Sequence, residues 1–246
     1  MKTYIWSLPT RLFHWILVAG LIGAYILAES ETNLNLHTAF GYMVGAAVIF
    51  RIIWGIAGPK YSRFTDFNFN PVKAINYVLH KDKNENDAGH NPAASIIMFL
   101  IIIFSGLLAL SGVFLLAAKG TGFFASLNTG IDKHTLKEMH EALFSIVAGL
   151  TVVHLLGNVH EFIFNRKRNT HLSMFNGYKT MDAQGIKLNV AQKVLSILGI
   201  IAVLSVLPYT IAKQDITKAD KKAGINAVET SGQGEAEHEE GDEDDD

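Results

Sequence analysis

The sequence predicts an all-α integral membrane protein built from transmembrane helices. Three observations support this fold class: 49% of the 246 residues are apolar, the mean hydropathy is +0.23, and several apolar runs are long enough to cross a bilayer. A polar, acidic C-terminal stretch lowers the mean, so the rest of the chain is more apolar than the average. The chain has no cysteine, which excludes disulfide bonds, thiolate metal sites and iron–sulfur clusters ligated by this chain.

Five apolar runs predict five transmembrane helices, because a helix needs about 17–25 apolar residues to span the hydrocarbon core. The runs cover residues 12–28, 39–57, 93–118, 142–164 and 194–212. The first run keeps aromatic residues and a histidine, which favours a retained anchor over a cleaved signal peptide. Arg51 interrupts the second run, but an arginine near a helix end can extend its guanidinium to the interface. We expect Pro208 to cap or kink the fifth helix.

Lysine and arginine in the connecting segments predict the orientation in the membrane. Residues 51–90 carry six of these basic residues and residues 166–187, after the fourth run, carry five, whereas residues 29–36 carry none. We therefore expect the N-terminus to be cytoplasmic. Five spans then place the C-terminus in the periplasm.

The C-terminal stretch differs in composition from the membrane part of the chain. Ten of the 23 acidic residues lie in residues 229–246, and the chain has almost no apolar residue to bury from residue 231 onward. Such a segment cannot offset its ordering entropy, so we expect it to be disordered. The predicted division is a core at 1–187, an additional transmembrane helix at 188–213 and a disordered acidic tail at 214–246. No nucleic-acid binding follows from the basic balance of the remainder.

Four of the ten histidines are candidate ligands within or at the ends of the predicted spans, where an ionisable side chain needs a reason. His14 lies in the first run, His37 precedes the second, and His140 and His154 lie at the start of the fourth helix and deeper along it. The 14 residues from His140 to His154 turn a helix by about 1400°, nearly four full turns, so both imidazoles leave one face about 21 Å apart. That spacing suits two stacked haem sites, one toward each membrane surface.

Depth in the membrane pairs these histidines, because a six-coordinate haem b takes two axial imidazoles. His37 and His140 both belong to the outer half of the bilayer, and His14 and His154 both belong to the inner half. We predict that each pair holds one of two haem b groups. For any single histidine, an ordinary buried or interfacial role is the alternative, and only the set of four favours haem.

Two arginines are candidates to bind the haem propionates, since guanidinium groups pair well with carboxylates. Arg11 lies three residues before His14, and Arg51 lies near the inner end of the second helix. Interfacial anchoring is the alternative for both arginines. His160 lies about 240° around the helix from His154 and points elsewhere. We expect the remaining histidines to be solvated residues of loops or the tail: His80, His90, His134, His171 and His238.

Four sequence blocks together resemble the bacterial cytochrome b561 and Ni/Fe-hydrogenase b-type cytochrome subunit family. They are WSLPTRLFHW at 6–15, LNLHTAFGYMVGAAVIFRIIWGIAGPKYSRF at 34–64, GHNPAAS at 89–95 and HEALFSIVAGLTVVHLLGNV at 140–159. The resemblance covers residues 4 to about 180. It implies a four-helix dihaem bundle, to which this chain adds a fifth transmembrane helix. It also implies the same two ligand pairs, His14 with His154 and His37 with His140.

The resemblance implies an electron-transfer subunit of the bacterial inner (cytoplasmic) membrane, surrounded by lipid. Members pass electrons between quinone or quinol and an outer-face partner, commonly a hydrogenase, a dehydrogenase or a c-type cytochrome, and we predict such a relay here. One alternative is a self-contained oxidoreductase that oxidises superoxide and reduces quinone. A metal transporter lined with histidines is another. The fifth helix and the acidic tail extend past the family core, so they leave the partner open.

Overall fold

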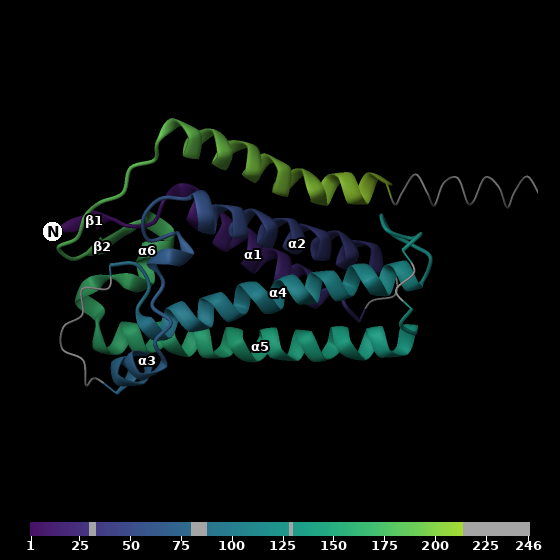
Figure 1. Ribbon diagram of the computed structural model, residues 1–246, viewed down its shortest axis with the longest axis horizontal. Helices are drawn as coiled ribbons and strands as arrows, with labels where there is room; N and C mark the ends of the chain where they lie inside the picture. Colours follow the sequence, from purple (N-terminus) through teal and green to yellow (C-terminus); the bar gives the residue numbers. More distant parts are fainter. Residues whose placement is uncertain (30–32, 80–87, 128–129, 214–246) are drawn as a thin grey trace, which may run out of the picture.

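The computed structural model shows a bundle of long helices with a cap of short elements at one end (Figure 1). It describes residues 1–29, 33–79, 88–127 and 130–213, so the predicted disordered tail at 214–246 lies outside the described residues. In chain order the elements are β1 (Lys2–Tyr4), α1 (Leu8–Ile26), α2 (Leu34–Ala57), η2 (Phe64–Asp66), α3 (Pro71–Val78), α4 (Pro92–Ala118), α5 (Lys133–Phe164), η3 (Arg166–Arg168), α6 (Thr170–Asn176), β2 (Tyr178–Thr180) and a last helix at Val190–Lys213.

Five helices among the described residues are long and apolar enough to cross a membrane: α1, α2, α4, α5 and the helix Val190–Lys213. They contain 19 to 32 residues each. The all-α membrane fold with five spans is therefore confirmed, and the protein is a multi-pass membrane protein.

The helices begin earlier than the apolar runs predicted, because polar residues cap and form their first turns. Asp132 starts α5 by accepting hydrogen bonds from the backbone nitrogens of His134 and Thr135, both at 3.0 Å. Asn91 starts α4 in the same way, with its side-chain oxygen 2.7 Å from the nitrogen of Ala94. A search for uninterrupted apolar residues misses such turns, although they continue the same helix.

The bundle packs as a chain of neighbouring helices. α1 packs against α2, α2 against α4, and α4 against α5. None of the extensive contacts between helices in the described part of the chain joins α5 to α1 or α2. The helix Val190–Lys213 lies along the outside of α2 (Figure 1), where Phe50 covers Gly199 so closely that a Cβ there would lie 2.3 Å from its ring. Side chains rather than closely packed backbones join α5 to α1, as in the stacked rings of Tyr25 and Phe144 with centroids 5.3 Å apart.

A short antiparallel strand pair closes one end of the bundle. β1 pairs with β2 in a register that places Thr3 opposite Lys179. Gly177 precedes β2 with a φ of 88°, and its carbonyl accepts hydrogen bonds from the nitrogens of Ile5 and Trp6 at 2.9 and 3.1 Å. This contact fastens the N-terminus to a segment more than 170 residues later. We call this the strand end of the bundle, which also carries α3 and α6, and the opposite end, with the α4–α5 connection, the loop end.

Candidate functional site

Two pairs of histidines bring α5 into contact with α1 and α2. His14 on α1 faces His154 on α5 with ring centroids 6.4 Å apart, toward the strand end. His37 on α2 faces His140 on α5 with centroids 6.2 Å apart, toward the loop end. The structure therefore brings together the four histidines predicted from the sequence, and in the predicted pairs. Their role as ligands stays a prediction.

The spacing within each pair fits two imidazoles that share one metal. A metal–imidazole bond is about 2 Å long, and an imidazole ring with bonds of about 1.33 Å has a radius of about 1.1 Å. Two rings on opposite sides of one metal therefore have centroids about 6 Å apart. In the described part of the chain, no hydrogen bond joins the two rings of either pair, so the ring nitrogens of a pair are not hydrogen-bonded to each other. Both separations match an iron held between the rings.

The His37–His140 pair is oriented by a hydrogen bond at Nδ1 of each ring. His37 Nδ1 donates to the carbonyl of Ala24 at 2.8 Å, which requires the hydrogen to be on Nδ1. Ser111 donates its own hydroxyl hydrogen to the carbonyl of Leu108 at 2.8 Å, so its oxygen accepts from His140 Nδ1 at 2.8 Å. In each neutral ring the Nε2 lone pair is left for a metal, which is the orientation that bound histidines need.

Gly112 lets the His140 ring lie against α4. A Cβ at this position would lie 3.2 Å from Cε1 of the ring, so a larger residue would have to displace the imidazole. Gly112 follows Ser111 directly in the chain. Neighbouring positions of α4 therefore provide both the acceptor for His140 and the room for its ring.

The His14–His154 pair lacks a comparable arrangement. His14 Nδ1 is buried and has no hydrogen-bond partner among the described residues. His154 Nε2 lies 3.2 Å from the side-chain nitrogen of Asn158, which also donates to the backbone carbonyl of His154 at 3.0 Å. A metal at His154 Nε2 would displace the Asn158 amide, which keeps its backbone acceptor. The two rings are therefore close enough to share a metal, but neighbouring residues do not orient them for metal binding through hydrogen bonds.

Arg51 places a positive charge near Phe13, the residue before His14 in α1. It is only 1% exposed, and its guanidinium lies 4.8 Å from the ring of Phe64 and 5.9 Å from that of Phe13. Nη1 of Arg51 is buried without a hydrogen-bond partner, and no carboxylate pairs with this side chain in the described residues. A buried cation without an anion is costly. The site is therefore suited to receive a negatively charged group.

Arg11 uses part of its guanidinium to bind α6 at the strand end. One of its terminal nitrogens donates to the carbonyl of Phe175 near the end of α6, where helix carbonyls lack partners. Its Nε is buried without a partner in the described residues. Arg11 thus fastens α1 to α6 and keeps one donor that faces the interior.

Comparison with known families identifies the bundle. A model of the prokaryotic cytochrome b561 matches residues 5–177, more than two thirds of the chain. The chain belongs to the prokaryotic cytochrome b561 family. Members of this family are membrane electron carriers that bind haem b through histidine within a four-helix bundle. Searches of curated proteins and of solved structures give no match.

The matched part of this cytochrome b561 family member contains all four facing histidines and both arginines. It ends before the helix Val190–Lys213, which lies outside the four-helix part. Two observations fit haem to the residues of the bundle: the spacing of the histidine pairs, and the buried polar atoms of His14, Arg11 and Arg51 that lack partners in the described residues. An iron between the rings and carboxylates near the arginines would satisfy both.

The expectation that His90 is a solvated loop residue is wrong. Both of its ring nitrogens are buried, and the ring lies 4.7 Å from that of Trp6 and 4.8 Å from that of Phe67. The position in a polar loop suggested exposure, whereas the chain folds this loop inward against the cap. The only sequence signal was the GHNPAAS block, which resembles the family. His160, in contrast, lies against Phe164 at 4.8 Å, away from the histidine pairs as expected.

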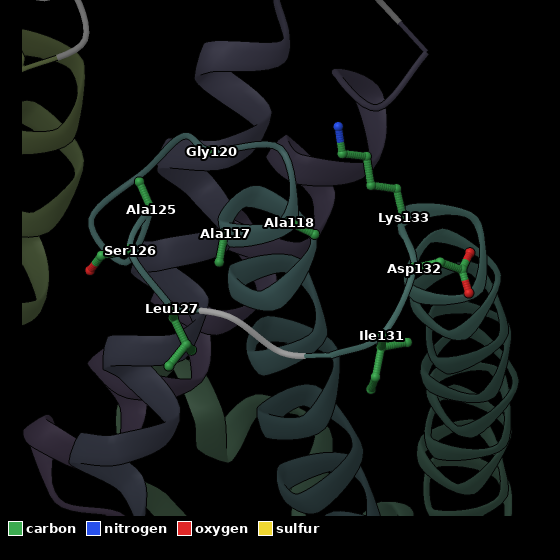
Figure 2. Close-up of a pocket in the computed structure, with 9 residues that line it drawn as sticks. All are labelled: Ala117, Ala118, Gly120, Ala125, Ser126, Leu127, Ile131, Asp132 and Lys133. Atoms are coloured by element: carbon green, nitrogen blue, oxygen red, sulfur yellow. The ribbon is translucent and has the colours of Figure 1, made fainter.

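A pocket of about 580 Å³ lies at the loop end of this family member, between the end of α4 and the start of α5 (Figure 2). Its lining is mostly small or apolar, and Figure 2 shows Asp132 and Lys133 pointing away from Leu127 and Ile131. The Asp132 carboxylate serves the helix cap, and its hydrogen bond from the Thr135 hydroxyl lowers its pKa. None of the candidate haem residues lines this pocket.

Proposed function

We propose that this cytochrome b561 family member is a dihaem relay that carries electrons across the bilayer between the quinone pool and a redox protein at the periplasmic face. His14 and His154 hold one haem b, and His37 and His140 hold the other. The observation that carries the proposal is the pair of facing imidazole couples, with centroids 6.4 and 6.2 Å apart, at two levels of the same helix α5. When bound, each haem supplies a one-electron centre that alternates between ferric and ferrous iron.

The residues of the bundle bind and orient rather than perform bond chemistry. The carbonyl of Ala24 and the hydroxyl of Ser111 hold the hydrogen on Nδ1 of His37 and His140, which leaves Nε2 of each ring unprotonated and able to bind iron. The apolar side chains of the spans exclude water from both sites. Arg51 lies at the His14–His154 level, where its charge neutralises a propionate, and Arg11 offers its remaining donor to the same group.

The distribution of basic residues supports the proposed orientation in the bacterial inner membrane. The segment after α2, the turn η3 and the strand β2 all bring lysines or arginines to the strand end, as the positive-inside rule expects of a cytoplasmic face. We place the N-terminus in the cytoplasm, the C-terminus in the periplasm and the His14–His154 site in the inner half. Quinone or quinol then exchanges electrons with one end of the relay, and a c-type cytochrome, hydrogenase or dehydrogenase subunit with the other.

The division of the chain follows the same proposal. Residues 1–187 form the dihaem core, 188–213 form an additional span, and 214–246 form an acidic tail. The family match over residues 5–177 supports the first boundary, since it ends before the last span. A histidine-lined metal transporter receives no support, because no three histidine, aspartate or glutamate side chains cluster as metal ligands in the described part of the chain.

Haem stoichiometry and electron transfer test this function. We expect the purified protein to contain two haem b groups per polypeptide, which titrate at two potentials in a spectroelectrochemical experiment. Quinol should reduce both haems, and reoxidation should require an added periplasmic acceptor. One haem per polypeptide would contradict the two-site proposal. Rapid turnover with superoxide and quinone alone would instead favour the self-contained oxidoreductase.

A further inference from the structure

Three basic side chains gather at the strand end around two aromatic rings. Lys179 is only 5% exposed, and its ammonium lies 5.3 Å from the ring of Trp6. His90 lies between Trp6 and Phe67, and the Arg51 guanidinium lies 5.9 Å from the same Phe67 ring. These residues come from α2, the loop before α4, and β2. Three distant segments therefore bring positive or hydrogen-donating groups to one buried place.

The loop that carries His90 is held on both sides. Before it, the carbonyl of Gly89 accepts a hydrogen bond from Lys179 Nζ at 2.6 Å. After it, Asn91 caps α4 and donates its side-chain amide to Glu161 Oε1 at 3.1 Å. A histidine anchored in this way has little freedom to turn toward solvent. Its ring is presented to the interior by the fold.

The buried His90 ring lacks the partner that its chemistry requires. Burial, together with the charges of Lys179 and Arg51, lowers the pKa of His90 well below the usual range, so the ring is neutral and carries one N–H donor. Neither ring nitrogen has a hydrogen-bond partner among the described residues, and an unmade buried hydrogen bond is costly. Arg51 Nη1, whose guanidinium lies near the same Phe67 ring, is unsatisfied in the same way. A common anionic acceptor would satisfy these donors together.

We propose that His90 is a positioning residue that donates a hydrogen bond to a carboxylate of the haem held by His14 and His154. This rests on the proposed function and adds a residue from the loop before α4. By drawing negative charge away from the iron, the hydrogen bond favours the ferrous state and raises the midpoint potential of that haem. The same carboxylate receives Arg51, so a neutral donor and a cation share one anion.

Two substitutions distinguish the effect of the His90 N–H donor from that of its aromatic ring. His90→Phe keeps an aromatic ring between Trp6 and Phe67 but removes the N–H group. His90→Gln loses the ring but keeps an amide donor. We expect His90→Phe to lower the midpoint potential of the haem at His14–His154, or to release that haem alone, while His90→Gln stays close to the unchanged protein. The potential of each haem is measured by spectroelectrochemical titration of the purified full chain.

His171→Phe is the matched control, because His171 also contacts an aromatic ring, that of Phe162 at 5.0 Å. It should leave both potentials unchanged. Unchanged potentials in His90→Phe, equal shifts in both His90 variants, or a larger shift in His90→Gln would overturn the proposal. Loss of bound anionic lipid with unchanged potentials would overturn it too, since the anion would then be a lipid phosphate. If the proposed dihaem function itself were wrong, the unsubstituted protein would lack a haem, so this result is distinguishable from a failure of the His90 proposal.

Discussion

The two histidine pairs reach nearly the same separation by different means. At the His37–His140 pair, a carbonyl and a serine hydroxyl orient both rings, and no arginine lies beside them in the described part of the chain. At the His14–His154 pair, the rings lack such orienting bonds, while Arg51 lies close by without an anionic partner. At the His37–His140 site the ligand rings are already oriented by hydrogen bonds. At the His14–His154 site the rings are not, but an unpaired buried arginine is available to bind an anionic group of the cofactor. We therefore expect the two sites to respond to different substitutions.

The largest effect should come from removing one ligand of either pair. His140→Ala should abolish the haem at His37–His140 and leave the other, and His154→Ala should do the reverse, because one imidazole cannot replace a bis-histidine site. Haem content per polypeptide and the difference spectrum measure this. His171→Ala, outside both pairs, should keep two haems. If either ligand variant kept both haems, that pairing would be wrong.

Substitution of Arg51 should affect the His14–His154 site alone. Arg51→Met keeps a long apolar side chain but leaves a buried carboxylate unpaired, which costs about 3 kcal/mol in haem binding. We also expect a lower midpoint potential for that haem, whereas Arg51→Lys should retain most of both. Haem release to an excess of apo-globin and a redox titration provide the two measurements. If the midpoint potential of the His37–His140 haem shifted instead, Arg51 would act on that site and the proposed difference between the two sites would be wrong.

Orienting residues should matter at one pair only. Ser111→Ala removes the acceptor of His140 Nδ1, and losing such a contact typically weakens metal binding by about 10–100-fold. Asn158→Ala removes an amide that contacts His154 Nε2, so haem retention at that site should not fall. The rate of haem transfer to apo-globin compares the two variants directly. Equal losses in both would show that the pairs are not prepared differently.

The smallest effect concerns the start of α5, eight residues before His140. Asp132→Ala removes the cap and should slightly lower the melting temperature and loosen the His37–His140 haem, whereas Asp132→Asn keeps a capping oxygen. Because the hydrogen bond from Thr135 depresses the carboxyl pKa, its stabilisation is present at neutral pH and lost as the pH falls through that depressed value. Melting curves in detergent should therefore converge for the unsubstituted protein and Asp132→Ala at acidic pH. A constant difference across pH would contradict this.

Local patterns predicted much of the fold. Hydropathy marked all five spans, since a bilayer demands a long apolar helix whatever its neighbours are. Helical periodicity placed His140 and His154 on one face of one helix, and the structure has both rings facing partners across the bundle. Helix starts were predicted less well, because caps such as Asp132 lie in polar sequence.

Long-range contacts account for what could not be predicted. β1 and β2 have three residues each and are too short to show an alternating pattern, yet they join distant parts of the chain. His90 is in a polar loop, and its burial depends on Trp6, Phe67 and Lys179 from other segments. The contact of Phe50 with Gly199, which positions the last span, is likewise invisible before the helices are packed.

The amino-acid sequence by itself determined that the chain spans a membrane, that it has five apolar helices, and which histidines lie at matching depths. These properties depend on composition and on the regular rise and turn of a helix, which each segment carries alone. Only the tertiary structure decided which nitrogen of each ring is engaged, that Arg51 and His90 are buried without an anion, and that the cap holds them there. Those properties arise where separate segments meet, because burial and hydrogen bonding belong to pairs of segments rather than to either one.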